Sequence, residues 1–195
     1  MSCPYWKQIC WYKGGEQMTH EAGIILITGI MAAGKSTVAQ ALAERLPKSV
    51  HLRGDVFRRM IVNGQASLGA EFTEEDYAQL RLRYELAANA AEGYVEAGFT
   101  VVYQDIILGT DLETVANRLK TAQPLYVIVL CPTPEVVAER EAGRSKVGYG
   151  SWTPDALNAV LRNDTPRLGL WLDTSALSAA ETVDVLLNRL NEAKI

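Results

Sequence analysis

The chain has 195 residues, 48% of them hydrophobic, which is enough for one domain with a sizeable core and short for two. Its formal net charge of -4 and its lack of any apolar run of about 18 residues argue against nucleic-acid and membrane partners. Three cysteines without metal-ligand spacing exclude a disulfide framework and indicate a cytoplasmic protein with reduced thiols.

The first 22 residues are predicted to form a tail that is either disordered or not native. They are rich in Trp and Tyr, show no periodicity and lack the apolar core of a signal peptide. The stretch from Lys13 to Glu16 can be encoded by a purine run that resembles a bacterial ribosome-binding site. We therefore hypothesise that Met18 is the native start; a partner-binding tail is the alternative. Residues 23–195 are predicted to form a single domain.

Short apolar runs alternate with helical patterns along this domain. Several of the runs are apolar on both faces, as in a parallel sheet that helices cover on each side. The predicted strands are residues 23–28, 49–53, 99–104, 125–130 and 168–173. This alternation predicts an α/β fold, doubly wound, with three layers and a five-stranded parallel sheet.

The helices have clear sequence signals. Between residues 74 and 97, apolar side chains recur at steps of three and four, while Arg83 falls largely off their face. Thr133 and Thr153, each followed by proline, and Ser178, which begins a capping box, are predicted N-caps. The predicted core-facing residues of the long helix are Leu80, Tyr84, Ala87, Ala88, Ala91, Tyr94 and Val95.

Residues 29–36, between the first predicted strand and a helix, match the pattern G-x-x-x-x-G-K-[ST]. Its glycines allow consecutive N–H groups to form an anion-binding nest, and the helix N-terminus adds partial positive charge. We predict that Lys35 binds the β- and γ-phosphates of a nucleotide, that Ser36 offers its hydroxyl to Mg²⁺ and that Thr37 reaches the α-phosphate. The predicted nucleotide-binding residues are Gly29, Ala32, Ala33, Gly34, Lys35, Ser36 and Thr37.

Two large classes of phosphate-loop protein do not fit the chain. An AAA+ motor is disfavoured because 195 residues leave no room for a lid domain and no predicted strand ends in Asp-Glu. A GTPase would need an Asn-Lys-x-Asp stretch, which the sequence lacks. A small kinase remains as the interpretation.

Four segments support that interpretation by resemblance: "ILITGIMAAGKSTVAQALAERL", "HLRGDVFRRM", "TVVYQDI" and "VIVLCPTPEVVAEREAGR". Together they resemble the small P-loop kinases related to chloramphenicol phosphotransferase, in a wider group with gluconate, shikimate and adenylate kinases. The resemblance covers about residues 23–192 and implies the P-loop NTPase fold, ATP with Mg²⁺, and a short lid. It implies transfer of the γ-phosphate to a hydroxyl of a small molecule, for which an antibiotic is a candidate. The alternatives are a nucleoside monophosphate kinase and a non-catalytic, nucleotide-dependent binding or resistance protein.

Two carboxylates and an arginine follow the second and third predicted strands, at the edge where open α/β sheets bind ligands. In similar kinases a carboxylate at the place of Asp55 orients the acceptor hydroxyl; a helix N-cap is the alternative. Arg58 resembles the arginine that grips the phosphate of a nucleoside monophosphate, or else is a solvated surface residue. Asp105 is expected to hold Mg²⁺, usually through water, or to orient the acceptor. The acceptor pocket is expected to be lined by residues 55–61 and 64–84.

A short lid is predicted at about residues 143–153, where cations and glycines follow a helix. Arg140 and Arg144 are four residues apart and share one helical face. Both are predicted catalytic residues that would reach the transferring phosphoryl group when the lid closes over ATP. The alternative is a helix C-terminus whose cations complement the dipole.

Overall fold

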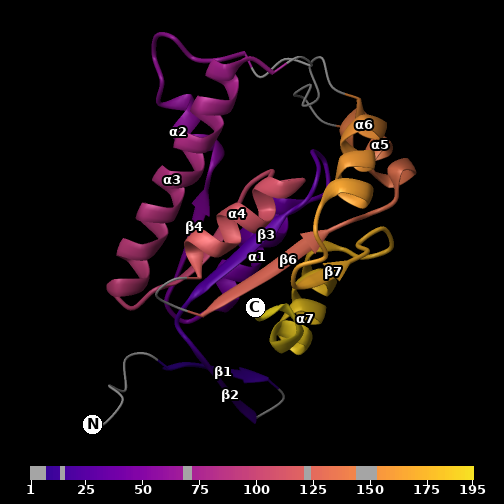
Figure 1. The fold of residues 1–195 in the computed structure, drawn as a ribbon. Coiled ribbons are helices and arrows are strands. Elements are labelled where there is room, and N and C mark those ends of the chain that lie inside the picture. The colour runs from indigo at the N-terminus through magenta and orange to yellow at the C-terminus, as the bar shows by residue number, and fades with distance from the viewer. Residues whose placement is uncertain (1–7, 14–15, 68–71, 121–123, 144–152) are drawn as a thin grey trace.

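The computed structural model describes residues 8–13, 16–67, 72–120, 124–143 and 153–195. Its central sheet has five parallel strands (Figure 1). In order across the sheet these are β4 (Ser49–Arg53), β5 (Thr100–Gln104), β3 (Ile24–Thr28), β6 (Leu125–Leu130) and β7 (Leu170–Leu172). The predicted α/β fold is confirmed. The last strand is shorter than predicted because Gly169 takes a left-handed φ of 63°, which interrupts the extended backbone.

Helices cover both faces of the sheet (Figure 1). On one face α1 (Lys35–Arg45) packs against α7 (Ala179–Arg189), and on the other α3 (Glu74–Glu96) packs against α4 (Thr110–Leu119). Every residue of the central strands β3 and β6 is buried, whereas the edge strand β4 is only partly covered. The hydrophobic core therefore lies around β3, and β3 leads directly into the phosphate loop.

The shorter helices lie near the loops at the ends of the strands. They are α2 (Asp55–Arg59), α5 (Pro134–Ala142), α6 (Pro154–Ala159), the π-helical turn η2 (Val160–Asp164) and the 3-10 turn η3 (Leu190–Ala193). Thr153 and Ser178 cap their helices through side-chain hydrogen bonds, as predicted. Thr133 occupies the predicted N-cap position but makes no capping bond. Among the described residues, no helix combines the length and the apolar character that crossing a bilayer requires.

The long helix α3 departs in two places from its predicted face. Tyr94, predicted to face the core, is 43% exposed and packs edge-on against Phe99. Arg83, predicted to lie largely off that face, has a side chain only 10% exposed. It stands three residues after Leu80 and four before Ala87, so it shares the core-facing side of the helix. The buried arginine becomes part of the site described below.

Residues 8–21 include a two-stranded antiparallel sheet of β1 (Gln8–Lys13) and β2 (Glu16–Glu21). This hairpin lies at the bottom of Figure 1, below the five-stranded sheet. It falls within the stretch for which the sequence predicts a disordered or non-native tail. The domain boundary at residue 23 and the hypothesis that Met18 is the native start remain predictions.

Candidate active site

A cavity of about 580 Å³ opens at the carboxyl edge of the sheet. The strand register explains why it forms there: Arg53 of β4 lies opposite Gln104 of β5, and Gln104 lies opposite Ile27 of β3. The loops that follow these three strands therefore meet. The cavity is lined by Met31, Ala32, Ala33, Gly34, Lys35, Ser36, Thr37, Val38, Arg53, Asp55, Arg83, Gln104, Asp105, Ile106, Arg140, Thr174, Leu177, Ser178, Ala179 and Thr182.

The phosphate loop, residues 29–36, has the backbone that an anion nest requires. Left-handed φ values occur at Gly29 (145°), Ala32 (60°) and Gly34 (91°). A Cβ at Gly29 would lie 2.4 Å from the carbonyl oxygen of Leu130, so no larger residue fits there. At Gly34 space is available, and the φ value alone favours glycine. The loop thus turns its main chain sharply into the start of α1.

Lys35 is the first residue of α1 and is buried against this loop. Its Nζ donates to the carbonyl oxygen of Ile30 at 2.7 Å, which folds the side chain back across the loop. Ser36 and Thr37 are exposed and line the cavity. The first-turn N–H groups of a helix have no intrahelical acceptor, and the N-cap residue Gly34 has no side chain to occupy them. This end of the cavity therefore suits a phosphate group.

Asp55 is the first residue of α2, and the N-cap position belongs to Gly54. The alternative interpretation of Asp55 as an N-cap is therefore wrong. Its Oδ2 accepts hydrogen bonds from Arg59 at 2.5 Å and from Arg53 at 3.3 Å. Its Oδ1 is buried and has no hydrogen-bond partner among the described residues. One carboxylate oxygen is thus held by arginines while the other is left without a described partner.

Asp105 follows β5 and is almost completely buried. Arg83 of α3 reaches it with two groups: Nε donates to Oδ2 at 2.7 Å, and Nη2 forms an ion pair with Oδ1. The backbone N–H of Ile106 donates to Oδ1 at 2.7 Å, and the Tyr103 hydroxyl donates to Oδ2 at 3.3 Å. Burial raises the pKa of Tyr103, so its hydroxyl stays a donor. Both carboxylate oxygens already accept hydrogen bonds, an arrangement that the sequence does not reveal.

Gly54 makes this arrangement possible. A Cβ on this residue would lie 1.9 Å from Oδ2 of Asp105 and 3.1 Å from the Tyr103 ring. Its φ and ψ are ordinary helical values, so glycine is required here for space and not for backbone conformation. The N–H of Gly54 also donates to the Gln104 carbonyl oxygen at 3.1 Å, which keeps the β4 and β5 ends together.

Arg58 lies outside the group of residues that line the cavity. Its Nη2 donates to the carbonyl oxygen of Ala66 at 2.5 Å. Gln79 of α3 holds the same segment by accepting from the N–H of Ala66 at 2.8 Å and donating to the Gly64 carbonyl oxygen at 2.7 Å. The described contacts of Arg58 therefore fasten residues 64–66 between α2 and α3.

Arg140 extends from α5 over the phosphate loop. Its Nη2 donates to the carbonyl oxygen of Thr174 at 2.9 Å, and its Nη1 lies 3.8 Å from where a Cβ of Gly34 would stand. The structure thus places this cation beside the phosphate loop. Arg144 and residues 144–152, which form most of the predicted lid, lie outside the described residues.

The structure brings together most of the predicted residues and adds others. Lys35, Ser36, Asp55, Asp105 and Arg140 share one cavity. The sequence did not single out Arg53 or Arg83 as site residues. Only Arg83 left a usable signal, its position three and four residues from the apolar side chains of α3. The cavity has two ends: the phosphate-loop end, with residues 31–38 and Arg140, and the β4–β5 end, with Arg53, Asp55, Arg83, Gln104 and Asp105.

Comparisons with known proteins agree with this architecture. A family model described as an AAA domain matches residues 24–163. An adenylyl-sulfate kinase of Paraburkholderia xenovorans (strain LB400) is 29% identical over 177 residues, which cover 86% of this chain and 92% of the relative.

Solved structures share the fold. A sugar kinase of Janibacter sp. HTCC2649 has a TM-score of 0.68 at 19% identity. The match covers 88% of this chain and 96% of the kinase chain. The Mycobacterium tuberculosis APS kinase, solved in complex with AMPPNP and APS, has a TM-score of 0.63 at 16% identity, with coverage of 87% and 98%.

Proposed function

The chain belongs to the AAA domain family whose model spans residues 24–163; its domain is a kinase-like P-loop domain, and the expectation that it is not an AAA+ motor remains a prediction. From that premise we propose that it is an ATP-dependent phosphotransferase that moves the γ-phosphate to a hydroxyl of a small molecule. One observation carries the proposal: a phosphate loop and a carboxylate with an unpartnered oxygen line the same cavity.

The phosphate-loop end is proposed to hold the triphosphate of ATP. The nest at residues 29–34 and the first turn of α1 offer N–H groups, and Lys35 supplies a full positive charge near the β- and γ-phosphates. The AMPPNP complex of the mycobacterial structural neighbour supports a nucleoside triphosphate as donor. Arg140 stabilises negative charge on the transferring group, because its guanidinium reaches over Gly34.

Ser36 is the residue that fits a magnesium site best, since its hydroxyl is exposed at the start of α1 and faces the cavity. Mg²⁺, when bound, would neutralise charge on the phosphates. The second proposed ligand, Asp105, fits direct coordination poorly, because Arg83, Tyr103 and the Ile106 N–H already occupy its oxygens. A contact through water is the role that this geometry leaves to Asp105.

Asp55 is proposed to orient the acceptor hydroxyl and to take its proton at Oδ1. Arg59 and Arg53 hold the carboxylate through Oδ2, which fixes the direction in which Oδ1 points. Phosphoryl transfer passes through a loose transition state with little need for a strong base, so a correctly aimed carboxylate is sufficient. Arg144 and the lid at residues 143–153 remain part of the proposal as groups that close the site.

The contacts of Arg58 weigh against the alternative of a nucleoside monophosphate kinase. Its guanidinium is bonded to the Ala66 carbonyl and does not line the cavity, so it is poorly placed to grip an acceptor phosphate. The other alternative, a nucleotide-dependent binding or resistance protein, shares the phosphate loop and differs only in the absence of turnover. An antibiotic acceptor belongs to the range of small molecules that a substrate screen should cover.

The proposal is tested by supplying γ-labelled ATP and Mg²⁺ to the protein with panels of sugars, sugar acids, nucleotides and antibiotics. Asp55→Asn keeps the shape of the side chain and is expected to lower turnover of any accepted compound by about 10²–10⁴-fold. Binding of AMPPNP should be unchanged. Asp184→Asn, at an exposed carboxylate of α7 paired with Arg45, is the matched control and should keep full turnover. Labelling that survives Asp55→Asn undiminished would contradict the assigned role.

A further inference from the structure

Arg83 is a buried cation whose hydrogen-bonding capacity is only partly used. An arginine carries five N–H donors. Its contacts with Asp105 engage Nε and one N–H of Nη2, and no described residue takes the other donors. The guanidinium lines the cavity beside Asp55 and Arg53, at the β4–β5 end.

The position of this guanidinium is tightly fixed. Asp105 cannot turn away, because the Ile106 N–H and the Tyr103 hydroxyl hold its two oxygens. On the helix side, the hydroxyl of Tyr84 donates to the Ile106 carbonyl oxygen at 3.0 Å and fastens α3 to the same loop. The unused donors of Arg83 are therefore presented to the cavity in one orientation, as a preformed site requires.

Charge at the β4–β5 end also favours an anion. Two guanidinium groups, Arg53 and Arg83, stand there against two carboxylates, and Arg59 adds a third positive charge by pairing with Asp55 from outside the cavity lining. Burial lowers the pKa of Arg83, yet arginine starts so high that the side chain stays charged near neutral pH. A partly buried positive charge with open donors is best satisfied by an oxyanion, which accepts parallel N–H bonds from a guanidinium.

We propose that Arg83 binds an oxyanion of the acceptor, a carboxylate, sulfate or phosphate group, and that Asp105 positions Arg83 for it. The inference rests on the proposed phosphotransferase function and narrows the acceptor to a hydroxylated anion. β5 lies between β4 and the phosphate-loop strand β3. An acceptor anchored at Arg83 can thus present a hydroxyl to Asp55 on one side and to the γ-phosphate on the other.

Sulfate binding provides a test that does not depend on turnover. The phosphate loop is first saturated with Mg²⁺ and AMPPNP, so that added sulfate reports on a second anion site through a shift in melting temperature. The double variant Arg83→Gln/Asp105→Asn replaces both charges and leaves no unpaired buried ion. We expect it to weaken sulfate binding by about 10-fold or more, with AMPPNP affinity preserved. Unchanged sulfate affinity, or a wild-type protein that binds no sulfate, would overturn the inference.

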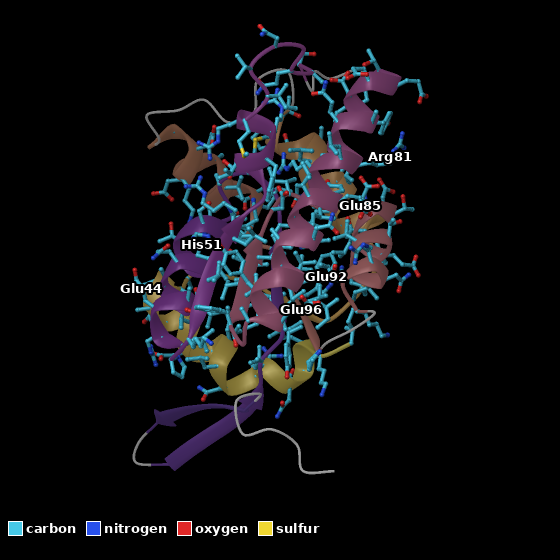
Figure 2. The ribbon with its side chains drawn as sticks, turned by 90° about the vertical axis from the view of Figure 1, so that its left-hand side faces the viewer. Glu44, His51, Arg81, Glu85, Glu92 and Glu96 are labelled. Carbon is cyan, nitrogen blue, oxygen red and sulfur yellow. The ribbon has the colours of Figure 1, made fainter. Side chains whose placement is uncertain are left out.

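The matched control is Arg81→Gln. Arg81 stands on the same helix within the range expected to line the acceptor pocket, but it is exposed to solvent and is not among the residues that line the cavity; Figure 2 labels it near one end of α3. Loss of this charge should leave sulfate affinity within about twofold, since long-range effects of exposed charges are screened. An equal loss in Arg81→Gln would show that general charge, and not the built site, attracts the anion.

Asp105→Asn alone separates the positioning role from a metal role. If Asp105 positions Arg83, sulfate affinity falls several-fold while the Mg²⁺ dependence of AMPPNP binding stays the same. A changed Mg²⁺ dependence with unaltered sulfate affinity would instead assign Asp105 to the metal and contradict the inference. Failure of AMPPNP to bind any of these proteins would count against the proposed function and not against the anion site alone.

Which kind of anionic group the acceptor carries is tested with pairs of acceptors, one charged and one neutral in each pair. Turnover is compared for gluconate and glucose and for adenylyl sulfate and adenosine, with wild type and the double variant. We expect the charged member of a pair to be preferred by the wild type, and the double variant to lose that preference mainly through a higher KM. A wild-type preference for the neutral member would contradict the assignment.

Discussion

The two ends of the cavity are built in different ways. The phosphate-loop end is made mostly by one uninterrupted stretch, residues 31–38, whose main chain is proposed to bind phosphate. The β4–β5 end is made by side chains from separate segments, among them Asp55, Arg83 and Asp105. One end therefore depends on local backbone conformation, and the other depends on side-chain contacts that include an ion pair between residues far apart in sequence, Arg83 and Asp105. Four substitutions test this difference, from the largest expected effect to the smallest.

The largest effect is expected at the phosphate-loop end. Lys35→Ala removes the one full charge that the loop itself carries and should lower phosphotransfer by about 10³-fold, about 4 kcal/mol of transition-state stabilisation. Turnover of γ-labelled ATP measures the loss. Lys48→Ala is the control, because its Nζ bonds the Ala97 carbonyl away from the cavity. Similar losses in both variants would mean that the effect is not specific to the loop.

Gly54→Ala tests the β4–β5 end through its packing. The new methyl group would collide with Asp105 and displace it from Arg83, so the free energy of unfolding should fall by about 3 kcal/mol. Urea denaturation measures this change. Gly93→Ala is the control in α3, where a Cβ meets no atom within 4 Å; it should leave stability unchanged or raise it by up to about 1 kcal/mol. A fully stable Gly54→Ala protein would show that the ion pair can move at little cost.

Thr28→Val tests the hydrogen bonds that join the end of β3 to the loop after β5. The buried Thr28 hydroxyl donates to the Ile107 carbonyl oxygen at 2.8 Å and accepts from the Ile107 N–H at 3.0 Å. Valine keeps the shape and leaves both backbone groups unpaired, which should cost about 2 kcal/mol of stability. Thr114→Val, at an exposed hydroxyl of α4, should cost less than about 0.5 kcal/mol. Equal unfolding midpoints for the two variants would show that the two hydrogen bonds between Thr28 and Ile107 do not stabilise the fold.

The smallest effect is expected at the contact between α4 and α3, the helix that carries Arg83. Arg118 pairs with Glu92 and Glu85 of α3, which Figure 2 labels along that helix, and donates to Asn89 at 2.8 Å. Arg118→Ala should cost about 1 kcal/mol, and less at high salt, because this network is partly exposed to solvent. Denaturation at low and high salt measures both effects. Arg45→Ala, which removes the single ion pair with Asp184, should cost less. A salt-independent loss would indicate packing and not charge as the source of the effect.

The sequence predicted the fold and the location of the phosphate loop well because their signals are local. Strand and helix periodicities, the capping box at Ser178 and the pattern of residues 29–36 each lie within a few turns of chain. The predicted face of α3 was wrong at Arg83, because a charged residue at a core-facing position is normally taken as solvated. Its partner stands 22 residues later, and only the packing of α3 beside β5 brings them together.

Asp55 and Asp105 show what the tertiary structure alone decided. Each follows a strand, so the sequence placed both at the edge of the sheet, but it could not tell them apart. The structure pairs both oxygens of Asp105 with fixed donors and leaves one oxygen of Asp55 without a described partner. The sequence by itself determined where this chain turns and which loop adopts the backbone of a phosphate loop, since those properties depend on neighbouring residues. Which charges neutralise one another depends on strand order and helix packing, and these exist only in the folded chain.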